Sequence, residues 1–341
     1  MPRFTASKIS TLRTLRAFSF LVLIVLIGCG PSKKEEVKSQ PVKLNPAPIA
    51  NADSAFFFVE KQVKFGPRVP NSNSHKKTGD YLVAKLRRYG AKVTEQNFES
   101  MSYDGKKLFL RNIIGSFYPE KQKRILLAAH WDTRPFADKD KEKPNAPFDG
   151  ANDGASGVGV LLEVARLLKD AAAPNVGIDI IFFDGEDWGE KNGETGPSLP
   201  AGQTSWWLLG SQYWASHKHV ANYSAYYGIL LDMVGAKNSK FFKEGGSVEY
   251  APSIVDKVWT TAAQLGFSNI FVNQTQAAII DDHVPVNEKA HIPMIDIVHY
   301  DPVYGYFGDY HHSTKDNLEV IDKHVLTSVA QVVIQVVYSE N

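Results

Sequence analysis

The sequence has almost no cysteine, no excess of charge of either sign and no apolar run long enough for a membrane span in a mature chain. Cys29 is the one cysteine in 341 residues, so an internal disulfide is excluded and a mature domain beyond it has no thiol for catalysis. The 38 basic and 37 acidic residues give a net charge of +1, and nucleic acid is therefore not an expected partner. With 43% hydrophobic and 22% charged residues, the composition is that of an ordinary globular protein.

The first 28 residues have the pattern of a secretory signal peptide. Basic residues from Arg3 to Arg16 precede a short apolar run, Ala17 to Gly28. The ending Leu-Ile-Gly-Cys resembles a bacterial lipobox, in which the cysteine receives a lipid. We therefore expect Cys29 to be the lipidated first residue and residues 29–49, rich in Lys, Glu and Pro, to be a tether. An incidental cysteine after a plain signal peptide or anchor is the alternative.

This leader predicts export to the periplasm. The lipid on Cys29 would anchor the protein to a membrane of the bacterial envelope, and the outer membrane is the expected one. From residue 50 to residue 341 there is no internal repeat, no low-complexity block and no second boundary, which predicts a single domain.

Within this domain, apolar strand-like runs alternate with helical patterns. The expected strands are 124–129, 178–183, 226–231 and 292–298. The expected helices are 81–89, 157–168, 205–215, 254–265 and 321–338. This alternation predicts an α/β fold with an open, mixed, mostly parallel central sheet flanked by helices.

Acidic and histidine side chains occur directly after these strands, after a long loop and near the end of the chain. They are His130, Asp132, Asp153, Asp184, Glu186, Asp187, Asp232, Asp281, Asp282, His283, His311 and His312. Ligands of open α/β sheets bind beyond the carboxyl ends of the strands, so these side chains are expected to gather at one site. Imidazole and carboxylate are the zinc ligands available when there is no thiolate. Each residue alone also has a structural interpretation, such as a turn or a solvated loop, but together they predict a zinc site.

The order of these motifs resembles the zinc aminopeptidase family, which also contains the animal-type glutaminyl cyclases. The similarity runs from about Val63 to the end of the chain. It rests on His130-Trp131-Asp132, the Asn-Asp-Gly-Ala-Ser-Gly run around Asp153, Phe-Phe-Asp-Gly-Glu-Asp at 182–187, Leu-Leu-Gly-Ser at 208–211, Leu-Asp-Met-Val-Gly-Ala at 231–236, Asp-Asp-His at 281–283 and His312.

The resemblance implies that Asp153, Asp187 and His312 hold the zinc. Glu186 matches the general acid/base of the family, a carboxylate beside the metal that is not coordinated to it.

Two branches of the family remain open. In the aminopeptidases, residues matching His130 and Asp232 hold a second metal, Asp153 bridges the two metals, and an activated water cuts the first peptide bond. In the cyclases one zinc is kept, and the carboxylate matching Asp232 pairs with another acid and with the catalytic glutamate. Both residues are present here, so His130 and its neighbour Asp132 are candidates either for a second metal or for support.

Three features favour the cyclase branch. Asp281 stands where the peptidases more often have a small polar residue, and the run from Asp281 through residue 299 resembles the cyclases. The third feature is a group of aromatic side chains expected to form a substrate pocket together with His311: Trp188, Trp206 and Trp207.

Three departures from the animal cyclases concern the same region. Asp187 replaces a glutamate ligand, and His311 replaces a tryptophan beside the metal histidine. The Gly- and Pro-rich stretch 189–202 is expected to be a long, family-variable loop beside the site.

The expected reaction is the conversion of the N-terminal glutamine of peptides or proteins to pyroglutamate with release of ammonia. One Zn²⁺ is expected, with Glu186, Asp232 and Asp281 as catalytic residues and the last two sharing a proton. The alternatives are a two-zinc aminopeptidase and a non-catalytic peptide-binding lipoprotein. The non-catalytic protein would have lost Glu186 or a ligand, and none is missing.

Overall fold

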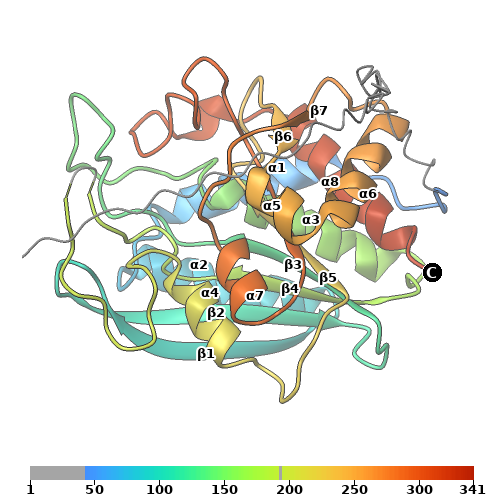
Figure 1. Ribbon diagram of the computed structural model, residues 1–341, viewed down its shortest axis with the longest axis horizontal. Coiled ribbons are helices and arrows are strands. Elements are labelled where there is room, and N and C mark those ends of the chain that lie inside the picture. The colour runs from blue at the N-terminus through green and yellow to red at the C-terminus, as the bar shows by residue number, and fades with distance from the viewer. Residues whose placement is uncertain (1–42, 192–193) are drawn as a thin grey trace, which may run out of the picture. The chain divides into compact units, whose positions relative to one another are not determined.

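The computed structural model describes residues 43–191 and 194–341 (Figure 1). The predicted signal peptide, Cys29 and residues 30–42 of the predicted tether lie outside the described residues. Within the two described ranges, no helix is both long enough and apolar enough to cross a membrane.

A six-stranded sheet organises the described chain in the order β1-β2-β4-β3-β5-β8. Its strands are β1 (Lys92–Met101), β2 (Lys107–Phe117), β3 (Arg124–His130), β4 (Gly177–Phe183), β5 (Tyr227–Asp232) and β8 (Met294–Val298). The four strands β4, β3, β5 and β8 run parallel, while β2 pairs antiparallel with both β1 and β4. The predicted fold class, a mixed and mostly parallel α/β sheet flanked by helices, is therefore confirmed.

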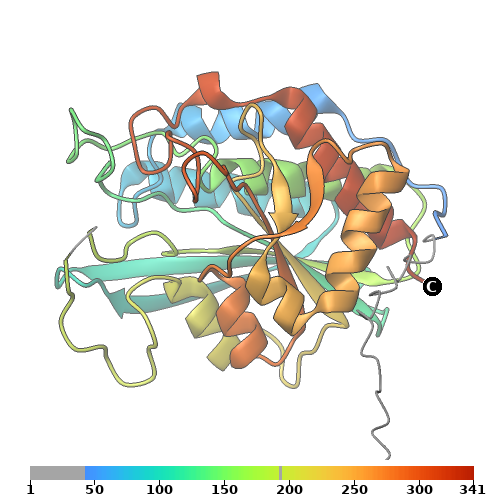
Figure 2. The ribbon, with the colours of Figure 1, turned by 45° about the horizontal axis from the view of Figure 1, so that its top comes forward.

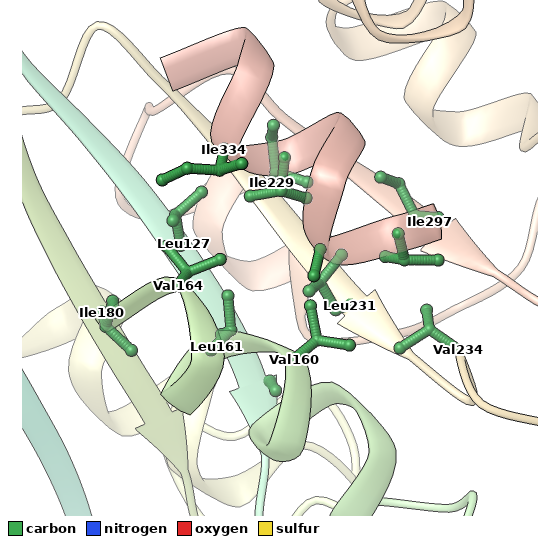
Figure 3. Close-up of a cluster of buried hydrophobic side chains, with 14 of the residues drawn as sticks. Leu127, Val160, Leu161, Val164, Ile180, Ile229, Leu231, Val234, Ile297 and Ile334 are labelled. Atoms are coloured by element: carbon green, nitrogen blue, oxygen red, sulfur yellow. The ribbon is translucent and has the colours of Figure 1, made fainter. Parts of the chain in front are cut away.

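The central strands are apolar on both faces because helices cover both. Successive side chains of a strand point to opposite faces, so Leu127 joins the larger core while its neighbours Leu126 and Ala128 join a second core on the other side. Figure 3 shows Leu127, Ile180 and other residues of the larger core packed between strands and helices. Burial of each such side chain contributes about 1.5–3 kcal/mol, which makes these strands the most firmly held part of the sheet.

The helices form a layer on each face, as Figure 2 shows. The larger core is shared with α1 (Ala52–Phe65), α2 (Asn73–Arg88), α3 (Ala155–Asp170), α6 (Pro252–Gln264) and α8 (Lys323–Tyr338). The second core is shared with α4 (Leu209–Ser216) and α7 (His283–Glu288), which also contact each other. The remaining elements are α5 (Gly245–Tyr250), a 3-10 turn (Leu318–Val320) and a small parallel sheet of β6 (Phe241–Lys243) and β7 (Phe271–Thr275).

The predicted strands and helices all occur, and two helices have a boundary shifted by more than two residues. The helix predicted at 81–89 begins at Asn73, because the Ser72 side chain caps it by accepting from the backbone N–H of His75. The helix predicted from residue 205 begins at Leu209, because Leu208 has a left-handed backbone with φ 62°. The antiparallel pair β1–β2 was not predicted.

The parallel strands bring their carboxyl ends to one edge of the sheet. His130 ends β3 and Asp232 ends β5, while Asp184 follows β4 directly. Gly154, with φ 85°, leads into α3 at the same edge. A side chain at this position would lie 2.7 Å from the Asp132 carbonyl oxygen and 3.0 Å from His130 Cε1, so glycine lets the loop approach the strand end.

Candidate metal centre and active site

A cavity of about 350 Å³ opens at this edge of the sheet. Acidic, histidine and aromatic side chains form most of its wall. The lining residues are Arg134, Asp138, Lys139, Asp153, Glu186, Asp187, Glu190, Ser205, Trp207, Asp232, Met233, Ile280, Asp281, Tyr306, Phe307, His311 and His312. The three residues expected as zinc ligands and the three expected as catalytic thus share one cavity.

The expected zinc ligands converge at the base of the cavity. His312 Nε2 lies 3.0 Å from Asp187 Oδ1 and 3.6 Å from Asp153 Oδ2. Asp153 and His312 also belong, with His311, to a set of donor atoms that all lie within 4.8 Å of one another. Asp187 is outside that set, and it reaches the group through its contact with His312.

Asp153 is held by a network under its loop. The Asp316 carboxylate accepts from the backbone N–H groups of Asn152 at 2.7 Å and Asp153 at 3.0 Å. From the other side, the wholly buried Arg68 donates to the backbone carbonyls of Gly150 at 2.7 Å and Asp153 at 3.1 Å. Since the backbone on both sides of Asp153 is tied down, its carboxylate has a fixed direction into the cavity.

Arg134 and Asp138 hold the other two ligands. The Arg134 guanidinium donates to the two Asp138 carboxylate oxygens at 2.9 and 2.7 Å, and its backbone N–H donates to Asp187 Oδ2 at 3.0 Å. Asp138 Oδ1 in turn faces His312 Nδ1 at 3.5 Å. A carboxylate behind the distal nitrogen orients a histidine for metal binding through the other nitrogen.

His130 forms a second group on the opposite side of Asp153. Its Nε2 lies 3.1 Å from Asp153 Oδ1 and 3.2 Å from Asp232 Oδ1, so these three residues also have metal-binding donor geometry. Asp132 supports the neighbouring turn, because its carboxylate accepts from the backbone N–H groups of Glu186 at 3.1 Å and Asp187 at 3.2 Å. The Asp132 carboxylate thereby fixes the segment that carries the proposed acid/base and one ligand.

The catalytic candidates are buried carboxyl groups that raise one another's proton affinity. Burial raises the pKa of Glu186 well above its ordinary value, and the negative charges of Asp187 and Asp281 raise it further. Burial and the charge of Asp281 likewise raise the pKa of Asp232 to about 7, against the hydrogen bond from His130. The pKa of Asp281 is also raised by burial. This wall of the cavity can therefore hold and exchange protons near neutral pH.

The residues expected as the substrate pocket divide into two pairs. Trp207 and His311 line the cavity, and the Trp207 ring lies parallel to the His312 ring with 6.0 Å between centroids. Trp188 instead packs in a separate cluster with Leu110. Trp206 is buried and donates to the Pro197 carbonyl oxygen at 3.1 Å. Trp188 and Trp206 do not line the cavity.

The donor set at the base of the cavity fits a zinc ion. Asp153 Oδ2 is buried and has no hydrogen-bond partner among the described residues. A buried carboxylate oxygen without a partner costs at least about 1–3 kcal/mol, a cost that a bound cation removes. Carboxylate oxygens and imidazole nitrogens are ordinary zinc ligands.

Several residues of the site were not singled out from the sequence. Arg134 and Asp138 form an ion pair, but they lie in an irregular loop, where their spacing of four residues predicts no contact. Lys139 and the aromatic residues Tyr306 and Phe307 come from irregular loops, where spacing carries no information about side-chain direction.

Comparison with known proteins relates this chain to one enzyme family. The family model for peptidase family M28 matches residues 112–337. A solved glutaminyl cyclase from Bacteroides thetaiotaomicron is 48% identical, with a TM-score of 0.83 over 87% of this chain and 100% of that one. A solved Zn-dependent exopeptidase from Parabacteroides distasonis is 51% identical, with a TM-score of 0.83 over 86% of this chain and 100% of that one.

A more distant relative is the glutaminyl-peptide cyclotransferase of Drosophila melanogaster. It is 25% identical over 293 residues, which cover 78% of this chain and 75% of that protein. The family match spans every candidate site residue from His130 to His312. On these grounds the chain belongs to peptidase family M28.

Proposed function

We propose that the protein is a glutaminyl-peptide cyclotransferase, which converts the N-terminal glutamine of peptides or proteins to pyroglutamate and ammonia. The observation that carries the proposal is the position of Asp281, which lines the same cavity as Glu186 and Asp232. A third buried carboxyl group beside the acid/base suits a reaction that moves protons without an external water. The solved glutaminyl cyclases that resemble this chain over most of its length support the same activity.

The proposed zinc ligands are Asp153, Asp187 and His312, with one zinc ion per chain. When bound, the zinc would polarise the side-chain amide of the substrate and stabilise negative charge that develops on its oxygen. The contacts that fix the ligands are those of Asp316 under Asp153 and of Asp138 behind His312.

Glu186 moves the proton in the proposed reaction. The α-amine of the substrate forms a bond to the carbon of its own side-chain amide, and the bond between that carbon and the amide nitrogen breaks. Glu186 takes a proton from the attacking amine and passes it to the departing nitrogen, which leaves as ammonia. A raised pKa suits this role, because a stronger base accepts the amine proton more readily.

Asp232 and Asp281 keep a proton beside Glu186. Because their pKa values are raised by burial and Asp281 repels a second charge on Asp232, the pair favours a state with one proton. A shared proton limits the negative charge around Glu186 while it gains and loses its own proton.

A two-zinc aminopeptidase is the competing function, and one observation favours it. His130, Asp153 and Asp232 form a second donor group that shares Asp153 with the first. A peptidase of this kind would use both groups and hydrolyse the first peptide bond.

The two functions are separated by their products. The purified protein is expected to release ammonia from a glutaminyl dipeptide and to leave an aminoacyl anilide uncleaved. The dipeptide product would be identified by the loss of the mass of ammonia. Robust anilide hydrolysis without a pyroglutamate product would contradict the cyclase and leave the metal site intact.

We also propose that the protein is a lipoprotein of the bacterial envelope, exported to the periplasm and anchored through Cys29. The support is the lipobox-like run before this cysteine and the basic residues ahead of the apolar segment. Labelling of growing cells with a fatty-acid probe is expected to mark the wild type and not Cys29→Ser. Equal labelling of the two proteins would overturn the anchor.

A further inference from the structure

Two adjacent histidines lie at similar distances from the same oxygen of Asp153. His311 Nε2 lies 3.8 Å from Asp153 Oδ2, and His312 Nε2 lies 3.6 Å from the same oxygen. The two rings are close, with 3.7 Å between their centroids. Distance to Asp153 alone does not decide which ring binds the metal.

The two rings differ in the partner of Nδ1, the ring nitrogen that does not face Asp153. His312 Nδ1 faces the Asp138 carboxylate at 3.5 Å, and Arg134 keeps that carboxylate charged by donating to both of its oxygens. A carboxylate only accepts, so the His312 proton belongs on Nδ1. Its Nε2 then has a free lone pair for a metal.

The Nδ1 atom of His311 faces a hydrogen-bond donor, whereas that of His312 faces an acceptor. Its Nδ1 lies 2.7 Å from the Lys139 ammonium nitrogen. An ammonium only donates, so Nδ1 must accept and the proton of a neutral ring belongs on Nε2.

Lys139 is firmly placed for this contact. Its backbone N–H donates to the His312 carbonyl oxygen at 3.1 Å, which ties its loop to the two histidines. Its ammonium also lies 5.1 Å from the centre of the Tyr306 ring, which lines the same cavity. Although Lys139 is exposed as a whole residue, its charged end thus points inward to His311.

We propose that Lys139 is a positioning residue that fixes the His311 tautomer and leaves His312 as the metal ligand of the pair. With its proton on Nε2, His311 turns an N–H group toward Asp153 and has no lone pair to offer there. The proposal rests on the proposed zinc site. In it, Lys139 places the His311 proton on Nε2, and Asp138 places the His312 proton on Nδ1.

The tautomers are measured directly by nitrogen NMR of metal-free protein labelled with ¹⁵N-histidine. The expected result is a proton on Nε2 of His311 and on Nδ1 of His312, with signals assigned from His311→Gln and His312→Gln. A proton on Nδ1 of His311 in the wild type would overturn the proposal. This readout needs neither zinc nor activity, so it is independent of whether the protein cyclises glutamine.

Charge reversal provides the second test. Lys139→Glu places a carboxylate behind His311 and is expected to move its proton to Nδ1, whereas Lys139→Arg keeps a donor and the wild-type tautomer. His312→Ala is expected to lose zinc, and Lys139→Glu with His312→Ala is expected to bind zinc at least tenfold more tightly than His312→Ala alone. Lys141→Glu, an exposed charge reversal on the same loop, is the matched control and should rescue nothing.

Two results would contradict this second test. One is an unchanged His311 tautomer in folded Lys139→Glu protein, with folding checked by circular dichroism. The other is zinc binding by the double variant no tighter than that of His312→Ala.

Discussion

The two imidazole–carboxylate groups that share Asp153 have similar compositions but differ in how their atoms are satisfied. On the His130 side, Nε2 lies 3.1 and 3.2 Å from its two carboxylate oxygens, within hydrogen-bonding distance of both. On the His312 side, one contact is 3.0 Å and the other is 3.6 Å, and Asp153 Oδ2 has no hydrogen-bond partner among the described residues.

This difference indicates what each group is suited to hold. A proton on His130 can be shared with both of its carboxylate neighbours, and the negative charge of Asp281 raises the pKa of Asp232 on the same side. The unsatisfied oxygen on the His312 side is best satisfied by a cation. We therefore propose a zinc site on the His312 side of Asp153 and a proton-holding site on the His130 side.

The largest expected effect comes from removing the ligand on the zinc side. His312→Ala is expected to weaken zinc binding by about 100-fold or more, since one ligand carries on the order of a quarter of the binding free energy of a four-ligand site. Mass spectrometry of metal content measures the loss. His130→Ala is the matched comparison and should keep close to one zinc per chain, and a reversed result would exchange the two assignments.

Replacement of the proposed acid/base has the next largest effect. Glu186→Gln preserves shape and should retain zinc, but turnover is expected to fall by about two to four orders of magnitude because no base accepts the amine proton. Steady-state ammonia release measures it. Glu190→Gln, at another carboxyl group that lines the cavity, is the control and should retain most activity. Equal losses in both variants would indicate a general electrostatic effect instead of proton transfer.

A smaller effect is expected from the carboxylate behind His312. Asp138→Asn removes the acceptor charge that orients the ring and should weaken zinc binding by about 10- to 100-fold. Competition with a fluorescent chelator gives the affinity. Glu142→Gln, at an exposed carboxyl group on the same loop, serves as control, and an unchanged affinity for Asp138→Asn would remove Asp138 from the site.

The smallest expected change is a shift of the pH profile. Glu186 must be ionised to accept a proton, so kcat/KM should rise with pH through its raised pKa. Asp281→Asn removes a negative neighbour, which favours ionisation of Glu186 and Asp232 and lowers both pKa values. The acid limb of the profile is therefore expected to move to lower pH. A limb that stays in place or moves upward would exclude this coupling.

The parts of the fold that carry the site were predictable because they are buried on both sides. The strands that end at His130 and Asp232 are continuous apolar runs, and the polar residues at their ends were predicted from the sequence to gather at one site. The antiparallel edge strand Lys92–Met101 is mostly polar and partly exposed, so its sequence lacks a comparable signal. An edge strand forms by pairing with its neighbour, and its own sequence does not show which segment that neighbour is.

The lining of the pocket was harder to predict, because the sequence does not show in which direction a loop side chain points. Trp188 is one residue from a proposed ligand, yet it turns away from the cavity, whereas Trp207, much farther along the chain, faces it. Lys139 lies on an irregular loop, and its contact with His311 spans 172 positions. Such contacts depend on how loops from different strands meet, which periodicity does not determine.

The most direct test of the central claim is a zinc titration of the metal-free enzyme, with ammonia release from a glutaminyl dipeptide as the readout. One-zinc cyclisation predicts that activity rises linearly and saturates at one zinc per chain, with no cleavage of an aminoacyl anilide at any point. Activity that requires two zinc ions per chain and appears as anilide hydrolysis would contradict the account.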